Sequence, residues 1–125
     1  MYLLLDPSKQ DQLRLALFTD SEVDWREEDC EPRDFLSLIG LMLKARGLNP
    51  LAIQGVAVVM GEGRFTATRV ATTIANSFAF ALQIPVLAVL KNHFVTPSDL
   101  IPTLSTSVVG QFISASYSGE PNIGN

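Results

Sequence analysis

Hydrophobic and polar residues alternate in three short segments near the start of the chain. The first is an apolar run at residues 2–5, the second covers residues 13–17, and the third begins at Val23 and includes Trp25. Such alternation is typical of strands that bury one face. We therefore expect an antiparallel meander whose third strand, rich in Asp and Glu, forms an edge of the sheet.

The pattern becomes helical over residues 33–46 and again over residues 65–82. The first segment follows an acidic, proline-containing turn and ends with basic residues and a glycine, which are typical helix boundaries. The second stops before a proline. Each helix is flanked by a continuous apolar run, at residues 53–60 and 86–90, as expected for parallel strands joined by a right-handed crossover.

The last part of the chain carries weaker signals. A short helical turn is expected after Pro97, and residues 107–116 alternate as a strand would. We divide the chain into an α/β lobe at residues 1–106 and a final strand with a loose tail at residues 107–125. A meander followed by helix, strand, helix and strand describes a ribonuclease-H-like or actin-like half-domain, with a mixed sheet and two main helices.

Composition narrows the function classes. With 125 residues, 47% of them hydrophobic and 18% charged, the chain has the size of one folded domain. The formal net charge is -4 and Lys and Arg do not cluster, so we expect no direct binding to nucleic acid. No apolar run reaches the roughly 18 residues of a membrane span. The single cysteine, Cys30, and the lack of a signal peptide predict a cytoplasmic protein.

The two predicted helices carry more apolar surface than one face of a sheet can cover. Bulky apolar residues surround most of the first helix, and in the second an alanine at every fourth position forms a groove for close packing. The rest of the second helix has Arg69 as its only charge, fewer than a solvated face normally carries. We predict that both helices pack on a partner. The predicted interface residues are Phe35, Leu38, Ile39, Met42, Ala67, Val70, Ala71, Ile74, Ala75 and Phe78.

Three places in the chain carry residues suited to chemistry. Gly61 and Gly63 join a strand to a helix, where backbone N–H groups bind phosphate, but Glu62 between them would repel it. Asp6 lies where ribonuclease-H-like enzymes hold a metal, yet a metal site needs further acidic partners. His93 follows a strand without an evident nucleophile or carboxylate partner. We expect no catalytic residue, metal or cofactor.

Two segments resemble the TsaB (YeaZ) family. Residues 61–69 read Gly-Glu-Gly-Arg-Phe-Thr-Ala-Thr-Arg and residues 79–86 read Ala-Phe-Ala-Leu-Gln-Ile-Pro-Val. The family pattern is G-P-G-S-F-T-G-L-R, then G-L-A-F-A-L-x-I-P-L, and residues 4–6 are similar to its opening L-x-L-D-T-S. The family's loop motif therefore falls on Gly61, Gly63, Phe65, Thr66 and Arg69. The chain departs from the pattern at Pro7, Glu62, Arg64, Ala67 and Thr68.

The resemblance implies a catalytically silent subunit built like the first of the family's two actin-like lobes. Such a subunit binds the catalytic protein TsaD through two helices, with the ATPase TsaE joining the complex that makes N6-threonylcarbamoyladenosine at position 37 of tRNA. Two other functions stay open: a homodimer through the same helices, and a peptidase-like or ATP-using enzyme acting through Asp6, Glu62 or His93. It also stays open that the two helices merely pack on each other and on the tail.

Overall fold

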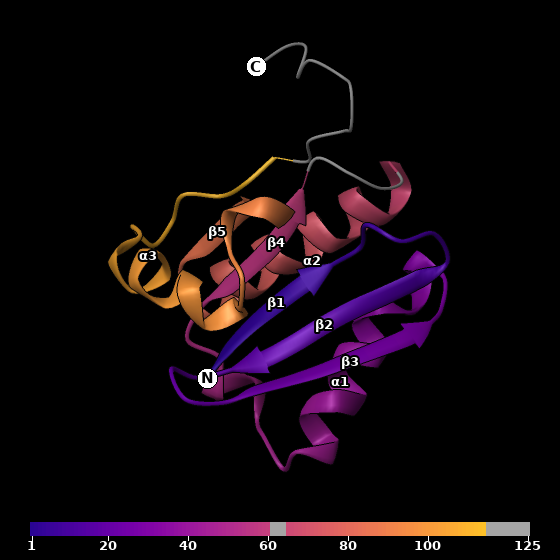
Figure 1. Ribbon diagram of the computed structural model, residues 1–125, viewed down its shortest axis with the longest axis horizontal. Helices are drawn as coiled ribbons and strands as arrows, with labels where there is room; N and C mark the ends of the chain where they lie inside the picture. Colours follow the sequence, from indigo (N-terminus) through magenta and orange to yellow (C-terminus); the bar gives the residue numbers. More distant parts are fainter. Residues whose placement is uncertain (61–64, 115–125) are drawn as a thin grey trace.

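A five-stranded mixed sheet forms the centre of the protein (Figure 1). The computed structural model describes residues 1–60 and 65–114. The spatial order of the strands is β3-β2-β1-β4-β5, with β1 antiparallel to β2, β2 antiparallel to β3, and β1, β4 and β5 parallel. The strands are β1 Tyr2–Asp6, β2 Gln12–Phe18, β3 Val23–Asp29, β4 Val56–Met60 and β5 Val86–Leu90. The predicted meander, the parallel crossover and the edge position of β3 are confirmed.

Helices cover both faces of this sheet. Helices α1 (Phe35–Ala45) and α2 (Phe65–Leu82) pack on one face, and the short helix α3 (Ile101–Thr106) packs on the other (Figure 1). Single turns of 3-10 helix precede α1 at Pro32–Asp34 and α3 at Pro97–Leu100, and two more lie at Pro50–Ala52 and Lys91–His93. Strand β4 begins later than the apolar run at residues 53–60 predicts, because Ile53 still caps the turn at Pro50–Ala52, where its N–H donates to the Pro50 carbonyl.

The final strand predicted at residues 107–116 is wrong over its described part. Residues 107–114 contain no strand and take an extended or turn conformation after α3. Val108 and Val109 are both exposed to solvent, so these apolar residues do not mark a buried strand face. The rest of the predicted tail, residues 115–125, lies outside the described residues.

Both long helices end with the backbone in the left-handed region. Gly47 has φ 66°, and the Leu48 N–H donates to the Leu43 carbonyl at 2.8 Å, which closes the C-terminus of α1. At the end of α2 the same conformation falls on Gln83, φ 55°, and the Ile84 N–H donates to the Ala79 carbonyl at 3.1 Å. After these closures the chain leads into the turn at Pro50–Ala52 and into β5, respectively.

The alanine stripe of α2 faces the sheet. Ala67, Ala71, Ala75 and Ala79 are all buried in the core cluster that joins α1 and α2 to β1, β2 and β4. Small side chains allow the helix axis to approach the sheet closely, so the stripe serves packing within the chain. The opposite layer is smaller, and there Leu100 and Leu104 pack on the other face of the sheet.

Replacing Phe35 by Ala should lower the free energy of unfolding by about 3–5 kcal/mol, because the ring is only 1% exposed and its removal leaves a cavity between α1 and the sheet. Leu36, the next residue of the helix, is 57% exposed, and Leu36→Ala should change the same quantity by about 0.5 kcal/mol or less. Urea unfolding followed by circular dichroism measures both. Equal losses in the two variants would contradict the assigned orientation of α1.

Candidate partner-binding surface

Six of the ten predicted interface residues lie inside the chain's own core. In this fold their side chains offer no surface to a partner, because the sheet already covers them. The buried six are Phe35, Ile39, Met42, Ala67, Ala71 and Ala75. The other four, Leu38, Val70, Ile74 and Phe78, are half-buried at the margin of the same core. The choice of these six as contact residues is therefore corrected, while the prediction that α1 and α2 face a partner stays a prediction.

The outer surface of the two helices is made by different residues. On α1, Leu36 and Leu41 are exposed on either side of Gly40. On α2, Phe80 is 69% exposed, and Arg69 is the only charged residue of the helix. The remaining exposed positions of α2 are Thr66, Thr73, Ser77 and Ala81. The exposed sides of the two helices therefore combine three large hydrophobic side chains with small hydroxyl-bearing ones and two cations, Lys44 and Arg69.

Two threonines do not belong to that outer face. Thr68 and Thr72 are 1% and 5% exposed and lie on the sheet side of α2, although both are polar residues. The hydroxyl of Thr72 lies 4.0 Å from the sulfur of Met60. A threonine is small enough to replace an alanine in this packing, so its polarity alone does not indicate which way it points.

The family loop motif is only partly described by the structure. Gly61 and Gly63 lie outside the described residues. Phe65 begins α2, and Thr66 and Arg69 are exposed on its first two turns. The Arg69 carbonyl accepts a hydrogen bond from the Thr73 hydroxyl at 2.9 Å, so this pair stays within the helix.

A shallow groove lies beside the C-terminal half of α2. It is lined by Thr73, Asn76, Ser77 and Phe80 of the helix and by Phe112 of the segment after α3. A second groove separates α1 from the β3 edge, where Leu38 and Leu41 face the side chains of β2 and β3. The outer surface thus has an apolar depression on α2 and another along the outer side of α1.

Charged residues form a row across β1, β2 and β3 on the other face of the sheet. The register places Asp6 opposite Arg14 and Arg14 opposite Glu27. Asp6 is 3% exposed, its carboxylate lies 3.9 Å from Arg14 and 3.7 Å from the Lys91 amine, and it accepts the Ser8 N–H at 3.0 Å. Two cationic side chains therefore stand where a metal ion would need to bind this carboxylate.

The cation of Arg14 makes two further contacts. Its Nε lies 3.0 Å from the Glu27 carboxylate, and its guanidinium stacks 4.0 Å from the centre of the Trp25 ring. The Lys91 amine also donates to the Ser8 hydroxyl at 2.9 Å, which joins the end of β5 to the turn after β1. Asp6 is thus held in a neutralised network rather than presented to a ligand.

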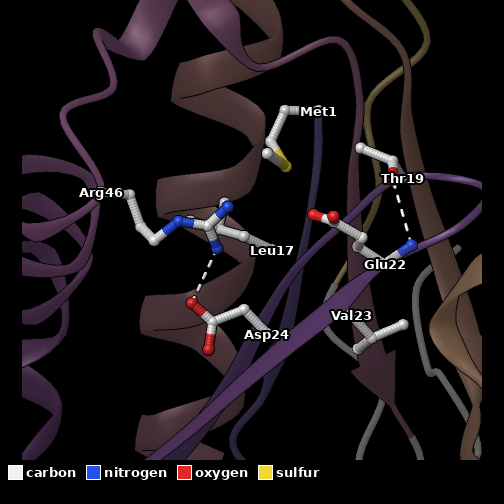
Figure 2. Close-up of a pocket in the computed structure, with 7 residues that line it drawn as sticks. All are labelled: Met1, Leu17, Thr19, Glu22, Val23, Asp24 and Arg46. Atoms are coloured by element: carbon white, nitrogen blue, oxygen red, sulfur yellow. Dashed lines mark hydrogen bonds and ion pairs between the residues drawn. The ribbon is translucent and has the colours of Figure 1, made fainter.

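A pocket at the opposite end of the sheet has a structural role (Figure 2). Arg46 at the end of α1 donates to the Asp24 carboxylate at 2.7 Å, which ties this helix to β3. Beside it, the Glu22 N–H donates to the Thr19 hydroxyl at 3.1 Å and closes the β2–β3 turn. Within this pocket Arg46 and Asp24 are paired with each other, which fits a structural role.

The remaining reactive side chains lie apart from one another. His93 is exposed, and its Nδ1 lies 3.4 Å from the Leu90 N–H. Burial raises the pKa of the Cys30 thiol, and the carboxylates of Asp34, Glu28 and Asp29 raise it further, which disfavours the nucleophilic thiolate. Among residues 1–60 and 65–114, no three His, Cys, Asp or Glu side chains gather as a metal site.

None of the described helices is long and apolar enough to cross a membrane.

Comparison with known proteins gives one match to a protein family. The family described as "TsaD: tRNA N6-adenosine threonylcarbamoyltransferase" matches residues 33–104, which is more than half of the chain. The matched segment includes α1, β4, α2, β5 and the turn before α3.

Two solved structures have the same fold. YeaZ from Pseudomonas aeruginosa is 31% identical over 71% of this chain, with a TM-score of 0.63. A second structure, described as similar to peptidase YeaZ from Pseudomonas aeruginosa, is 30% identical over 72% of this chain, also with a TM-score of 0.63. The match covers 44% of each of those chains, so this chain spans less than half of their length. The expected actin-like, ribonuclease-H-like α/β fold is confirmed.

Replacing Asp6 by Asn should lower the free energy of unfolding by about 1–3 kcal/mol, because the cations of Arg14 and Lys91 then lose their shared buried anion. Asp20→Asn, in the exposed β2–β3 turn, is the matched control and should leave stability unchanged. Urea unfolding with and without millimolar Mg²⁺ measures both effects. A midpoint that Mg²⁺ raises in the unmodified chain but not in Asp6→Asn would contradict the neutralised network and favour a metal site.

Proposed function

This chain belongs to the tRNA N6-adenosine threonylcarbamoyltransferase family as a TsaB (YeaZ)-like protein, and we propose that it acts as a non-catalytic subunit of a complex that modifies tRNA. The product of this complex is N6-threonylcarbamoyladenosine at position 37 of tRNA. A TsaD-like subunit performs the transfer, and a TsaE-like ATPase joins the assembly. The chain acts in the cytoplasm and contributes a binding surface.

The observation that carries the proposal is the outer face of α1 and α2. Leu36, Leu41 and Phe80 are all more than half exposed there, and Arg69 is the only charge on the five turns of α2. A helix face that stays in water normally carries several charges, whereas a face that packs on another subunit is depleted of them. Two adjacent helices that each carry a single charge, Lys44 on α1 and Arg69 on α2, support docking of a partner's helices across the pair.

The charges around the reactive side chains support a non-catalytic role. Asp6, the residue at the position of an enzyme's metal ligand, is neutralised by Arg14 and Lys91. The pKa of the Cys30 thiol is raised, and within the described residues the hydrogen bond of His93 is to the Leu90 N–H rather than to a carboxylate. These features favour a scaffold over a degenerate peptidase-like or ATP-using enzyme.

Charge also favours contact with protein over direct contact with RNA. The β3 edge and the turns beside it carry most of the acidic residues of the chain, and the net charge is -4. Phosphate groups would be repelled from this edge. The tRNA is therefore bound by the TsaD-like partner in this proposal, with this chain on the side away from the nucleic acid.

Light scattering of this chain alone and mixed with the TsaD-like protein of the same organism tests the proposal. We expect a heterodimer that the variant Leu36→Glu/Arg69→Glu weakens by about tenfold or more, because each change places a carboxylate in the interface. The control Val95→Glu/Lys9→Glu introduces the same types of charge at exposed positions away from the two helices. It should bind as the unmodified chain does.

Three outcomes separate the candidate functions. A heterodimer that is sensitive to the helix variant but not to the control supports the scaffold. If the chain instead forms a homodimer that does not bind the TsaD-like protein and that the same variant breaks, the scaffold is replaced by a homodimer through the same helices. A monomer in both samples removes the proposed function.

A further inference from the structure

The segment after α3 crosses to the other side of the sheet and lies on α2 (Figure 1). Its contact is centred on one residue of the helix. The Asn76 amide nitrogen donates to the Ile113 carbonyl at 2.8 Å, and the Ile113 N–H donates to the Asn76 Oδ1 at 3.0 Å. One side chain thus pairs with both backbone groups of one residue, as a neighbouring strand would.

Side chains strengthen this contact on both sides of the amide. Ile113 is half-buried and packs against the core cluster under α2. The Phe112 ring lies 6.4 Å from the Phe80 ring at 54°, a tilted aromatic pair at the rim of the groove. Val108 and Val109, earlier in the segment, stay exposed. The attachment to α2 therefore depends on residues 112 and 113.

The attached segment overlaps the surface proposed for the partner. The groove that Phe112 helps to line is formed by Thr73, Ser77 and Phe80, and these residues belong to the outer face of α2. A partner helix packed along α2 cannot occupy the same space as Phe112. Part of the proposed docking surface is therefore already covered by the chain itself.

We propose that residues 111–114 are a resident competitor on α2, bound in cis by the Asn76 amide and the Phe80 ring, which a partner subunit displaces when it docks. This inference rests on the proposed function, and it adds that residues 111–114 lower the affinity of the chain for its partner. Because only the uncovered form binds the partner at this place, the apparent affinity falls by the fraction of chains that are uncovered. Phe112 and Phe80 remain at least half exposed after pairing, as expected of a contact that a larger interface replaces.

The test compares two variants of the tail and leaves the helix unchanged. Phe112→Ser/Ile113→Pro removes the aromatic pair and the N–H that Asn76 accepts, whereas Val108→Ser/Val109→Ser removes two apolar side chains from the exposed part of the same segment. Calorimetric titration with the TsaD-like protein should give about tenfold tighter binding for the first variant and unchanged binding for the control.

Amide hydrogen exchange at Ile113 in the unmodified chain gives an independent measurement. The N–H should exchange slowly in the free chain, because Asn76 accepts it, and about tenfold faster or more in the complex. Equal affinities with Ile113 still protected in the complex overturn the inference and leave the proposed function intact. Unprotected exchange in the free chain also overturns the inference alone. If no version of the chain binds the TsaD-like protein, the proposed function falls and the inference falls with it.

Discussion

Close packing of the alanine stripe of α2 on the sheet is the constraint on which the rest of the structure depends. Ala71 and Ala75 are completely buried, and their small size brings the helix backbone near β4, which is itself buried on both faces. A larger side chain at either position would push α2 away from the sheet and open the shared core with α1. The orientation of both helices, and so the identity of their outward residues, follows from this contact.

That orientation determines which surface is left for a partner. With Phe35 and Ile39 turned toward the sheet, Leu36 and Leu41 are left exposed on α1, and α2 presents Thr73, Ser77 and Phe80. The same helices thus form the core with one side and offer an apolar, weakly charged surface with the other. The proposed interface needs no rearrangement of the core, because its residues and the packing residues are different sets.

The polar network at the carboxyl end of β1 occupies a carboxylate that could otherwise take part in chemistry. A carboxylate at this place in a ribonuclease-H-like fold is suited to hold a metal, but Asp6 is flanked by Arg14 and Lys91. The cations compensate the cost of burying the charge and join β1, β2 and the end of β5. Asp6 therefore stabilises the fold although it lies at the position of a metal ligand. This agrees with the proposal that the chain contributes a binding surface.

Local sequence patterns determined most of the fold. The bounds of α2 and β5, the acidic edge strand, and the closure of α1 by Gly47 all follow from periodicity and boundary residues, because these signals act over a few neighbouring positions. The resemblance at residues 61–86 also identified the family without help from the structure. That α1 and α2 face a partner stays a prediction, and six of the ten residues chosen for that surface lie in the chain's own core.

Only the tertiary structure decided which sides of those helices are covered. A helix with apolar residues around most of its circumference has no single face that periodicity can assign to the core, so Phe35 and Leu36 are equivalent by pattern although one is buried and the other exposed. The same holds for contacts between distant positions. Asn76 meets Ile113 across 37 residues, and Lys91 meets Ser8 across 83, because the folded chain brings those groups together and no local pattern records the distance.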